Sequence, residues 1–182
     1  TLSVLNKSKL IEKDIENSYL ELSSHDITII SYTINELDNE YLESFIRSIW
    51  KKTNKFLIIF EPGSKHGFNN IKRIRELLLA SSANIVAPCT HNNTCPMNEP
   101  DWCHFSKRIE RTSYQRFLKE GTDSFEDEKF SYLIASKLPV KEENSRILRN
   151  HDSNKVGIQL KLCNKNGLEY FFYADDLLMI CK

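Results

Sequence analysis

The chain has 182 residues, of which 40% are hydrophobic, and it carries 25 basic and 25 acidic side chains. This length suits one domain with a core of its own, or one domain with a small extension. The balanced charge excludes an overall electrostatic attraction to nucleic acid, so any such binding requires a local basic patch.

Neither membrane insertion nor secretion is indicated by the sequence. The longest apolar runs, FLIIF (56–60) and LLMIC (177–181), are far too short to span a bilayer. The first residues lack the features of a signal peptide and do not include an initiator Met, so we expect a fragment or a trimmed chain. Five cysteines without a secretory signal favour a reducing compartment, where clustered cysteines indicate metal binding more than disulfides.

Three strands that alternate with two helices are predicted in the first half of the chain. A nearly continuous apolar, β-branched run at 26–32 predicts a strand buried on both faces, and further buried strands are predicted at 55–63 and 84–88. Two amphipathic helices lie between them, with apolar residues at helical spacing: Leu42, Phe45, Ile46, Ile49 and Trp50, then Phe68, Ile71, Ile74, Leu77 and Leu78. This order predicts a doubly wound α/β sheet.

The second half of the chain predicts an additional strand and a hairpin. Residues 128–137 (EKFSYLIASK) are typical of a strand that could close the sheet as an antiparallel partner. Beyond Pro139 a polar connector leads to two apolar segments around the turn Asn164–Gly167, which is typical of a β-hairpin. We therefore expect an α/β domain over 1–138, with a cysteine loop at 88–104, and a β-hairpin extension over 139–182.

Three of the five cysteines lie in one proline-containing loop: Cys89, Cys95 and Cys103. An irregular loop lets several thiolates converge on a soft metal, although this one lacks the paired C-x-x-C knuckles of the common zinc ribbon. Cys163 offers a fourth thiolate, whereas the apolar surroundings of Cys181 favour plain packing. Spacing alone favours zinc over iron–sulfur, with His91 and His104 as alternative zinc ligands, and metal-free burial of the cysteines stays open.

Five long motifs occur along the chain: DITIISYTINEL, FLIIFEPGSKHGFNNIKRIRELLL, APCTHNNTCP, DWCHFSKRIERTSYQRFLK and FEDEKFSYLIASK. Together they resemble the methyltransferase-like small-ribosomal-subunit assembly factors, which comprise mitochondrial ribosomal small-subunit proteins and their bacterial relatives. The similarity runs from about Asp26 to Lys137, with a looser echo through Cys163. It implies a Class I (Rossmann-like) methyltransferase fold for S-adenosylmethionine (SAM), with an inserted cysteine loop, of which this chain is the C-terminal part.

The resemblance also implies a [4Fe–4S] cluster that is held by four cysteines. Carried over to this chain, Cys89, Cys95 and Cys103 match the loop ligands, and Cys163 falls where the family has its distant cysteine. The cluster thereby becomes the favoured cofactor, and zinc stays the alternative.

The glycine-rich turn of a SAM site is not found in this chain, since no two of its five glycines form a G-x-G turn. Against the family pattern, the strands of the cofactor site should lie upstream of Thr1, and SAM would bind only with that segment present. The rest of the pocket would be a wall made by Ser31, Tyr32, Asn35 and Glu36. A strand-to-helix turn with a capping role explains these residues equally well, and catalysis by this chain alone is not expected.

A basic stretch with interleaved aromatic residues follows the cysteine loop. Its positive side chains are Lys107, Arg108, Arg111, Arg116 and Lys119, and its aromatic ones are Phe105, Tyr114 and Phe117. Basic groups neutralise phosphates and aromatic rings stack on unpaired bases, although a solvated face above core aromatics explains the same pattern. The family's ribosomal association favours contact with small-subunit rRNA. The acidic run 125–130 (FEDEKF) predicts a turn with carboxylates that are solvated or paired with this basic stretch.

The resulting prediction is a monomeric factor that binds an iron–sulfur cluster and rRNA in small-subunit assembly or translation. The resemblance places it in the bacterial cytoplasm or the mitochondrial matrix. The first alternative is an active SAM-dependent rRNA methyltransferase with an upstream cofactor-binding segment, and the second is a zinc-stabilised interaction module. A sheet without its central strands is also expected to expose an edge and an apolar face.

Overall fold

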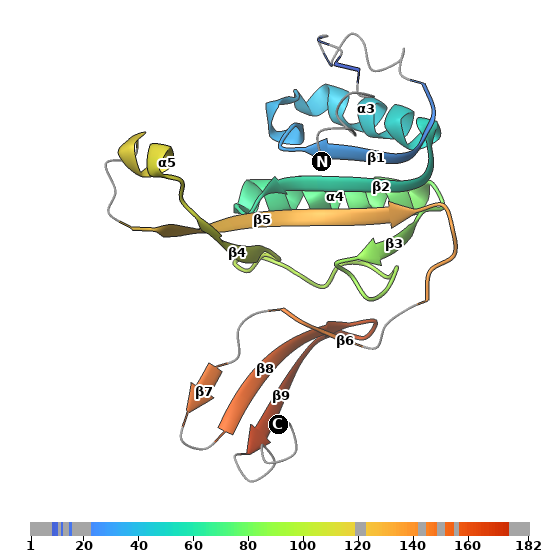
Figure 1. Cartoon of the computed structure of the whole chain (residues 1–182). Coiled ribbons are helices and arrows are strands. Elements are labelled where there is room, and N and C mark those ends of the chain that lie inside the picture. Colours follow the sequence, from blue (N-terminus) through green and yellow to red (C-terminus); the bar gives the residue numbers. More distant parts are fainter. Residues whose placement is uncertain are drawn as a thin grey trace.

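The computed structural model describes residues 9–10, 12, 15, 23–118, 123–141, 145–148, 152–154 and 157–174. They form a five-stranded and a four-stranded sheet, and two long helices lie against the first sheet (Figure 1). Among these residues no helix combines the length and the apolar character that crossing a membrane requires.

The first sheet has the spatial order β1 (His25–Ser31), β2 (Thr53–Pro62), β5 (Phe125–Ser136) and β3 (Asn84–Ala87), and β4 (Phe105–Glu110) also pairs with β5. β1 and β2 are parallel, whereas β5 runs antiparallel to β2, β3 and β4. The predicted antiparallel partner is thus confirmed, but it lies between β2 and β3. Mixed α/β topology of this kind is compatible with a Rossmann-like fold.

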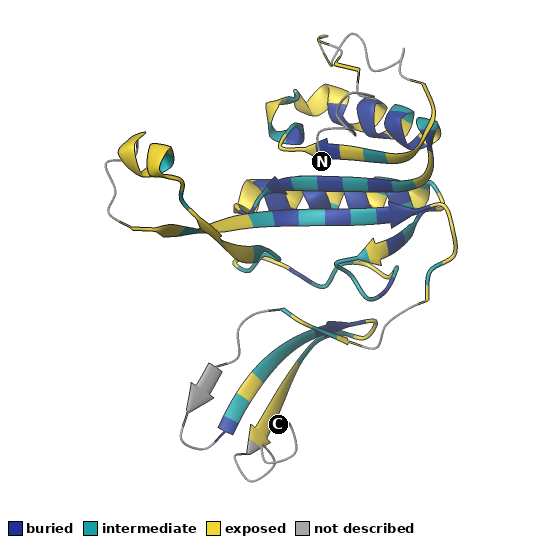
Figure 2. Ribbon diagram, in the orientation of Figure 1, coloured by how far each residue is buried: buried dark blue, intermediate teal, exposed yellow. Residues whose placement is uncertain are grey.

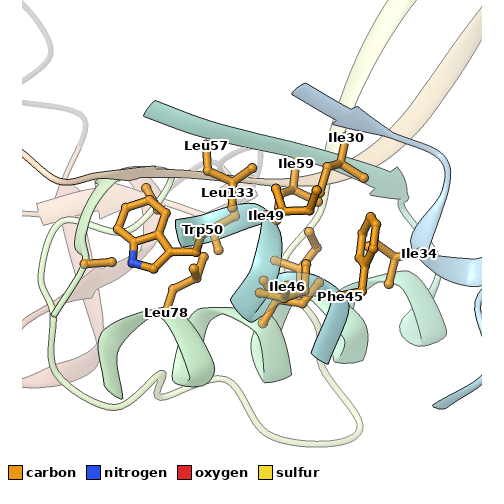
Figure 3. Packing of buried hydrophobic residues seen from close by; sticks show 14 of the residues in the cluster. Ile30, Ile34, Phe45, Ile46, Ile49, Trp50, Leu57, Ile59, Leu78 and Leu133 are labelled. Carbon is orange, nitrogen blue, oxygen red and sulfur yellow. The ribbon is translucent and has the colours of Figure 1, made fainter. Parts of the chain in front are cut away.

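The core lies between this sheet and the helices α3 (Asn39–Lys52) and α4 (Lys65–Ala80), as Figure 3 shows. The apolar stripe predicted for α3 is buried in full. In β2, Leu57 and Ile59 point toward the helices and pair across the strands with Ala135 and Leu133 of β5. Alternate residues of two adjacent strands therefore meet two helical stripes, which is the arrangement that the sequence periodicities predict.

β1 is not buried on both faces, which corrects its prediction. Ile30 belongs to the core, but Ile27 and Ile29 are 55% and 63% exposed (Figure 2). The reason is that β1 forms an edge of the sheet in the described chain, and both helices pack on the face that carries Ile30. The helical cover expected on both faces of a doubly wound sheet is thus found on one face, and the expected exposed apolar edge is present.

The second sheet is built around β8 (Gly157–Asn164), which forms the predicted hairpin with β9 (Gly167–Ala174). Two short strands pair with successive parts of β8: β6 (Ser145–Ile147) and β7 (Asp152–Asn154). The segment predicted as a polar connector is therefore partly β-structure. The apolar pattern of this segment is weak, so the sequence alone does not predict strands there. The strands form because they pair with β8.

Two glycines fix the start of α4 against the strands. A Cβ atom at Gly67 would lie 2.1 Å from the carbonyl oxygen of Pro62, and one at Gly63 would lie 2.7 Å from the backbone of Lys129. Such distances leave no room for any side chain. The Ser64 side chain caps the helix by accepting a hydrogen bond from the Gly67 backbone N–H. The start of α4 is therefore held against the strands, which gives the side chains of its C-terminal half a defined position.

Candidate functional site

A small cavity lies between the cysteine loop, α4 and the second sheet. Its wall contains four free cysteines: Cys89, Cys95, Cys103 and Cys163. The cavity measures about 40 Å³, which is more than the about 10–15 Å³ that one water molecule needs. Cys181 lies outside the described residues. The structure thus gathers at one cavity the three loop cysteines and the distant cysteine that the sequence singled out.

α4 holds the cysteine loop from one side. The Nη2 atom of Arg75 donates hydrogen bonds to the carbonyl oxygens of His91 and Asn93, at 2.9 and 2.6 Å. One turn earlier, Lys72 Nζ donates to the carbonyl oxygen of Met97 at 2.8 Å. Because α4 is anchored in the core, these bonds give an irregular loop a defined position.

The second sheet holds the same loop from the other side. Arg146 of β6 donates from Nη1 to the carbonyl oxygen of Pro88 at 3.0 Å, and its guanidinium lies 4.0 Å from the ring centre of Phe105. Lys161 of β8 forms an ion pair of 2.6 Å with Asp101, with both side chains less than one-fifth exposed. These contacts bring Cys163 to the loop across some sixty residues of chain.

The thiols lie in a poorly solvated environment. Burial raises the pKa of Cys103 to about 12 and that of Cys163 to about 11, and it also raises the pKa of Cys89. Neighbouring cysteines add to each rise in pKa, and Arg146 opposes all three. Arg75 also opposes the rise at Cys89 and at Cys163. All four sulfurs are thus close enough to influence one another. Because the pKa values of Cys89, Cys103 and Cys163 are raised, a metal that binds their sulfurs must displace the protons.

The donor set fits a soft metal centre. The described residues that line the cavity include four cysteines and His91 but no Asp or Glu. This set suits zinc or iron–sulfur and does not suit magnesium or calcium. His91 Nε2 lies 3.8 Å from Cys163 Sγ, whereas His104 stacks on Trp102 outside this cavity. Within the described part of the chain no three His, Cys, Asp or Glu side chains have converged to metal-binding spacing. Joint ligation of one metal therefore requires the sulfurs to move closer together.

The predicted wall of a SAM pocket follows the carboxyl end of β1. Tyr32 has a left-handed backbone (φ 53°), and its hydroxyl donates to Glu128 at 3.5 Å. Asn35, in the short 3₁₀ helix η2 (Ile34–Glu36), accepts a hydrogen bond from Asn70 of α4 at 2.9 Å. Ser31 and Glu36 are exposed. The four residues thus border one turn, and their role in cofactor binding stays a prediction.

Glu61, at the end of β2, is buried beside this turn. From the sequence it was expected only as part of a strand end. Its Oε1 accepts a hydrogen bond from the Ile34 backbone N–H at 2.9 Å. Burial raises the pKa of Glu61, although hydrogen bonds from backbone N–H groups of the turn oppose the rise. The sequence contains a signal for this burial. Glu61 continues the alternation of inward-facing residues that begins with Leu57 and Ile59, and an acidic residue is unusual at such a position.

The basic stretch forms β4 and the short helix α5 (Ser113–Leu118), which project from the first sheet in Figure 1. Arg108 makes a bidentate ion pair with Asp127, and Arg111 pairs with Glu126, so the expected pairing with the acidic run is confirmed. That run forms the start of β5 and not a turn. Lys107 and Arg116 make no ion pair with another described residue. Lys119 lies outside the described residues.

The aromatic residues of this stretch divide into two groups. Phe105 packs against Phe130 and Tyr132 on the sheet. Tyr114 and Phe117 on α5 are 68% and 78% exposed. An open groove of about 1010 Å³ runs beside β4 and β6, and its lining includes Trp102, His104, Arg108 and Arg146. Basic and aromatic groups therefore share one surface.

Comparison with known proteins gives one consistent result. The family model for the mitochondrial small ribosomal subunit protein Rsm22 matches residues 3–169. The chain is 28% identical over 153 residues to the mitochondrial Rsm22-cox11 tandem protein 2 of Schizosaccharomyces pombe, which covers 73% of this chain and 19% of that protein. It is 25% identical over 122 residues to the human mitochondrial ribosome assembly protein METTL17, which covers 62% and 26% respectively. The chain thus spans a minor part of these relatives.

Proposed function

The chain belongs to the Rsm22 family of mitochondrial small ribosomal subunit proteins, and from this membership we propose that it acts in assembly of the mitochondrial small ribosomal subunit. The match of the family model over residues 3–169 carries the proposal. The printed name of the human relative, a mitochondrial ribosome assembly protein, supports it. Of the two compartments predicted, these relatives favour the mitochondrion over the bacterial cytoplasm.

Sedimentation of the full-length protein tests this function. A tagged copy is expressed from its own locus, and mitochondrial extracts are separated on a sucrose gradient. We expect the protein in fractions that contain the small subunit or its precursors, and we expect its depletion to reduce the ratio of small-subunit to large-subunit rRNA. Sedimentation apart from small-subunit rRNA, together with an unchanged rRNA ratio after depletion, would contradict the proposal.

We further propose that Cys89, Cys95, Cys103 and Cys163 hold a [4Fe–4S] cluster. The four thiols at one cavity, the lack of carboxylate in its lining and the family membership support this assignment. Such a group supplies a rigid cross-link when bound. The residues around it already hold the cysteine loop against α4 and the second sheet, so the cluster would complete a joint between the two sheets.

Anaerobic purification followed by an absorbance spectrum and iron, sulfide and zinc analysis tests the cofactor. About four irons and four sulfides per chain would support the cluster, and loss of both in Cys95→Ser but not in Cys181→Ser would assign it to this cavity. About one zinc in a colourless protein would replace the cluster by a structural zinc site. A folded protein without metal would contradict both assignments.

For rRNA we propose a contact surface that includes Lys107, Arg116 and the groove beside β4. The unpaired positive charges, the exposed rings of α5 and the open groove suit a backbone with unstacked bases. The double change Lys107→Glu with Arg116→Glu should weaken binding to small-subunit rRNA and reduce its salt dependence. The pair Lys51→Glu with Arg73→Glu alters the same charge on exposed positions of α3 and α4 and serves as the control.

Binding of SAM is a proposal for the full-length protein only. Its pocket would include the wall at Ser31, Tyr32, Asn35 and Glu36, because ligands of open α/β sheets bind beyond the carboxyl ends of parallel strands. Calorimetric titration of the full-length protein with SAM, compared with Tyr32→Ala, tests the wall. Equal affinity of the two proteins would remove Tyr32 from the site.

A further inference from the structure

Among the described residues that line the cysteine cavity, three are positive and none is negative. Lys72 and Arg75 come from α4, and Arg146 comes from β6 of the second sheet. Neither arginine forms an ion pair with a described carboxylate, whereas the other buried cation at this junction, Lys161, has Asp101. Within the described part of the chain, the cavity is therefore an electropositive site without an acidic side chain in its lining.

Arg75 is the extreme case, because it is only 2% exposed. Its Nη2 holds the carbonyl oxygens of the cysteine loop, but Nε and Nη1 have no hydrogen-bond partner of ordinary geometry in the described structure. An arginine stays charged inside proteins. A buried charge without a counter-ion is strongly destabilising, so an anion is expected next to this guanidinium.

Among the described residues that line the cavity, the thiols are the groups that can supply this anion. Four thiolates on a doubly charged cation, whether Zn²⁺ or an oxidised [4Fe–4S] core, leave a centre with two negative charges. Two arginines from opposite sides of the cavity match that charge.

We propose that Arg75, together with Arg146, is the counter-cation of an anionic metal–thiolate centre in this cavity. Arg75 is a positioning residue, since it acts on the centre through its charge and through the loop that it holds. The inference rests on the proposed metal binding, but it does not depend on which metal is bound. It predicts that the site binds a metal through four thiolates more tightly while the guanidinium is present, and that a redox-active centre is reduced more easily because of it.

Cobalt uptake separates the charge from the folding role. The reduced full chain is titrated with Co²⁺, and thiolate-to-cobalt absorption bands report the bound metal. Arg75→Gln should lower the affinity by about tenfold to a hundredfold, the usual range for a residue behind the ligands. Arg75→Lys keeps the charge and should lie between Arg75→Gln and the unmodified protein. Arg73→Gln removes the same charge from an exposed position of α4 and should change nothing.

A reduction potential gives an independent measurement where the purified protein contains iron and sulfide. Arg75→Gln should shift the potential of the centre to more negative values, because the reduced form carries one more negative charge. A tenfold change in the ratio of oxidised to reduced form corresponds to about 59 mV for one electron. Loosening of the loop alone does not predict a shift of the potential to more negative values. Arg75→Lys keeps the positive charge, so its potential should stay close to that of the unmodified protein.

The outcomes are distinct. Co²⁺ affinity that is equal in Arg75→Gln and the unmodified protein overturns the proposal, and so does a folded chain that forms no thiolate–cobalt complex. Purified protein with zinc in place of iron removes the proposed cluster but leaves the cobalt comparison as the test of Arg75. Circular dichroism shows whether Arg75→Gln folds. If it does not, Arg146→Gln is the replacement variant, since Arg146 is only partly buried, and it should lower the Co²⁺ affinity several-fold. An unchanged affinity of Arg146→Gln then overturns the proposal.

Discussion

The first sheet and the joint around the cysteine cavity are stabilised in different ways. Behind the first sheet, Ile46, Leu57 and Ile59 are fully buried in a continuous apolar cluster that two helices cover. At the joint, backbone carbonyls of a loop meet arginine and lysine side chains, and the buried groups include the Cys163 thiol and the Arg75 guanidinium. The comparison shows that one region is stabilised by a continuous apolar core, whereas the other depends on hydrogen bonds between charged side chains and loop carbonyls.

This difference has a consequence for local stability. Apolar burial is independent of small ligands, but a joint made of charged hydrogen bonds and unligated thiols gains stability by mass action when a metal binds. We therefore expect the two sheets to respond separately to mutation, to metal and to pH. The four predictions below test that separation.

The largest effect is expected from a cavity in the apolar core. Ile46→Ala should lower the free energy of unfolding by about 2–5 kcal/mol, because it removes buried methylene groups from a close-packed cluster. Ile29→Ala removes the same atoms from the exposed face of β1 and should change this free energy by less than about 0.5 kcal/mol. Denaturant titration measures both, and similar losses would show that the face of β1 is covered in solution.

Metal removal should act on the joint and spare the core. After treatment of the purified holoprotein with a chelator under reducing conditions, amide hydrogen exchange in β8 should accelerate by about tenfold or more, since the metal stabilises only the docked arrangement. Exchange in β2 should stay the same. Mass spectrometry of peptides from both strands provides the comparison, and equal acceleration would mean that the two sheets unfold as one unit.

The partly buried ion pair at the joint should contribute more than an exposed pair of equal length. Lys161 and Asp101 are 16% and 19% exposed, while Lys55 and Asp26, also 2.6 Å apart, are 51% and 58% exposed. Lys161→Ala should cost about 1–2 kcal/mol. Lys55→Ala should cost at most about 0.5 kcal/mol, because solvent screens the pair. Denaturant titration would measure both losses of stability. Limited proteolysis in the segment that follows β5 would show whether the joint opens more often in Lys161→Ala.

The smallest effect, and one of opposite sign, is expected at Glu61. Its pKa is raised by burial above the usual value of 4.5, so the unfolded chain ionises first as the pH increases. Stability from this group is complete below about pH 4.5 and decreases as the pH rises through the folded pKa. Glu61→Gln keeps an oxygen acceptor for the turn and cannot ionise.

Glu61→Gln should therefore be at least as stable as the unmodified protein at pH 7, with a smaller decline between pH 4.5 and 7. Glu36→Gln, from an exposed position, should leave the pH profile unchanged. Thermal denaturation over this pH range compares the three proteins. A variant that loses stability at pH 7 would show that the carboxylate is charged and needed by the backbone N–H groups of the turn.

Most of the first sheet could be predicted from periodicity. The positions of β2, α3 and α4 follow from apolar residues at helical or alternating spacing, and most of these residues are buried. The β8–β9 hairpin forms as predicted, but the apolar residues 170–173 of β9 are exposed. Burial of β1 was predicted wrongly because an apolar run shows what a strand can bury and not what covers it. The short strands β6 and β7 were missed, since pairing with β8 and not their own residues makes them strands.

For the candidate site, the sequence by itself determined the chemistry of the ligands: three cysteines in one loop, a distant fourth, and residues that resemble one family. Only the tertiary structure brought Cys163 to the loop and turned Arg75, a charge within the apolar stripe of Ile71, Ile74 and Leu78, toward the same cavity. The physical reason is that side-chain type is a local property. Convergence of thiols and cations at one buried point depends instead on how α4, the loop and the second sheet pack together.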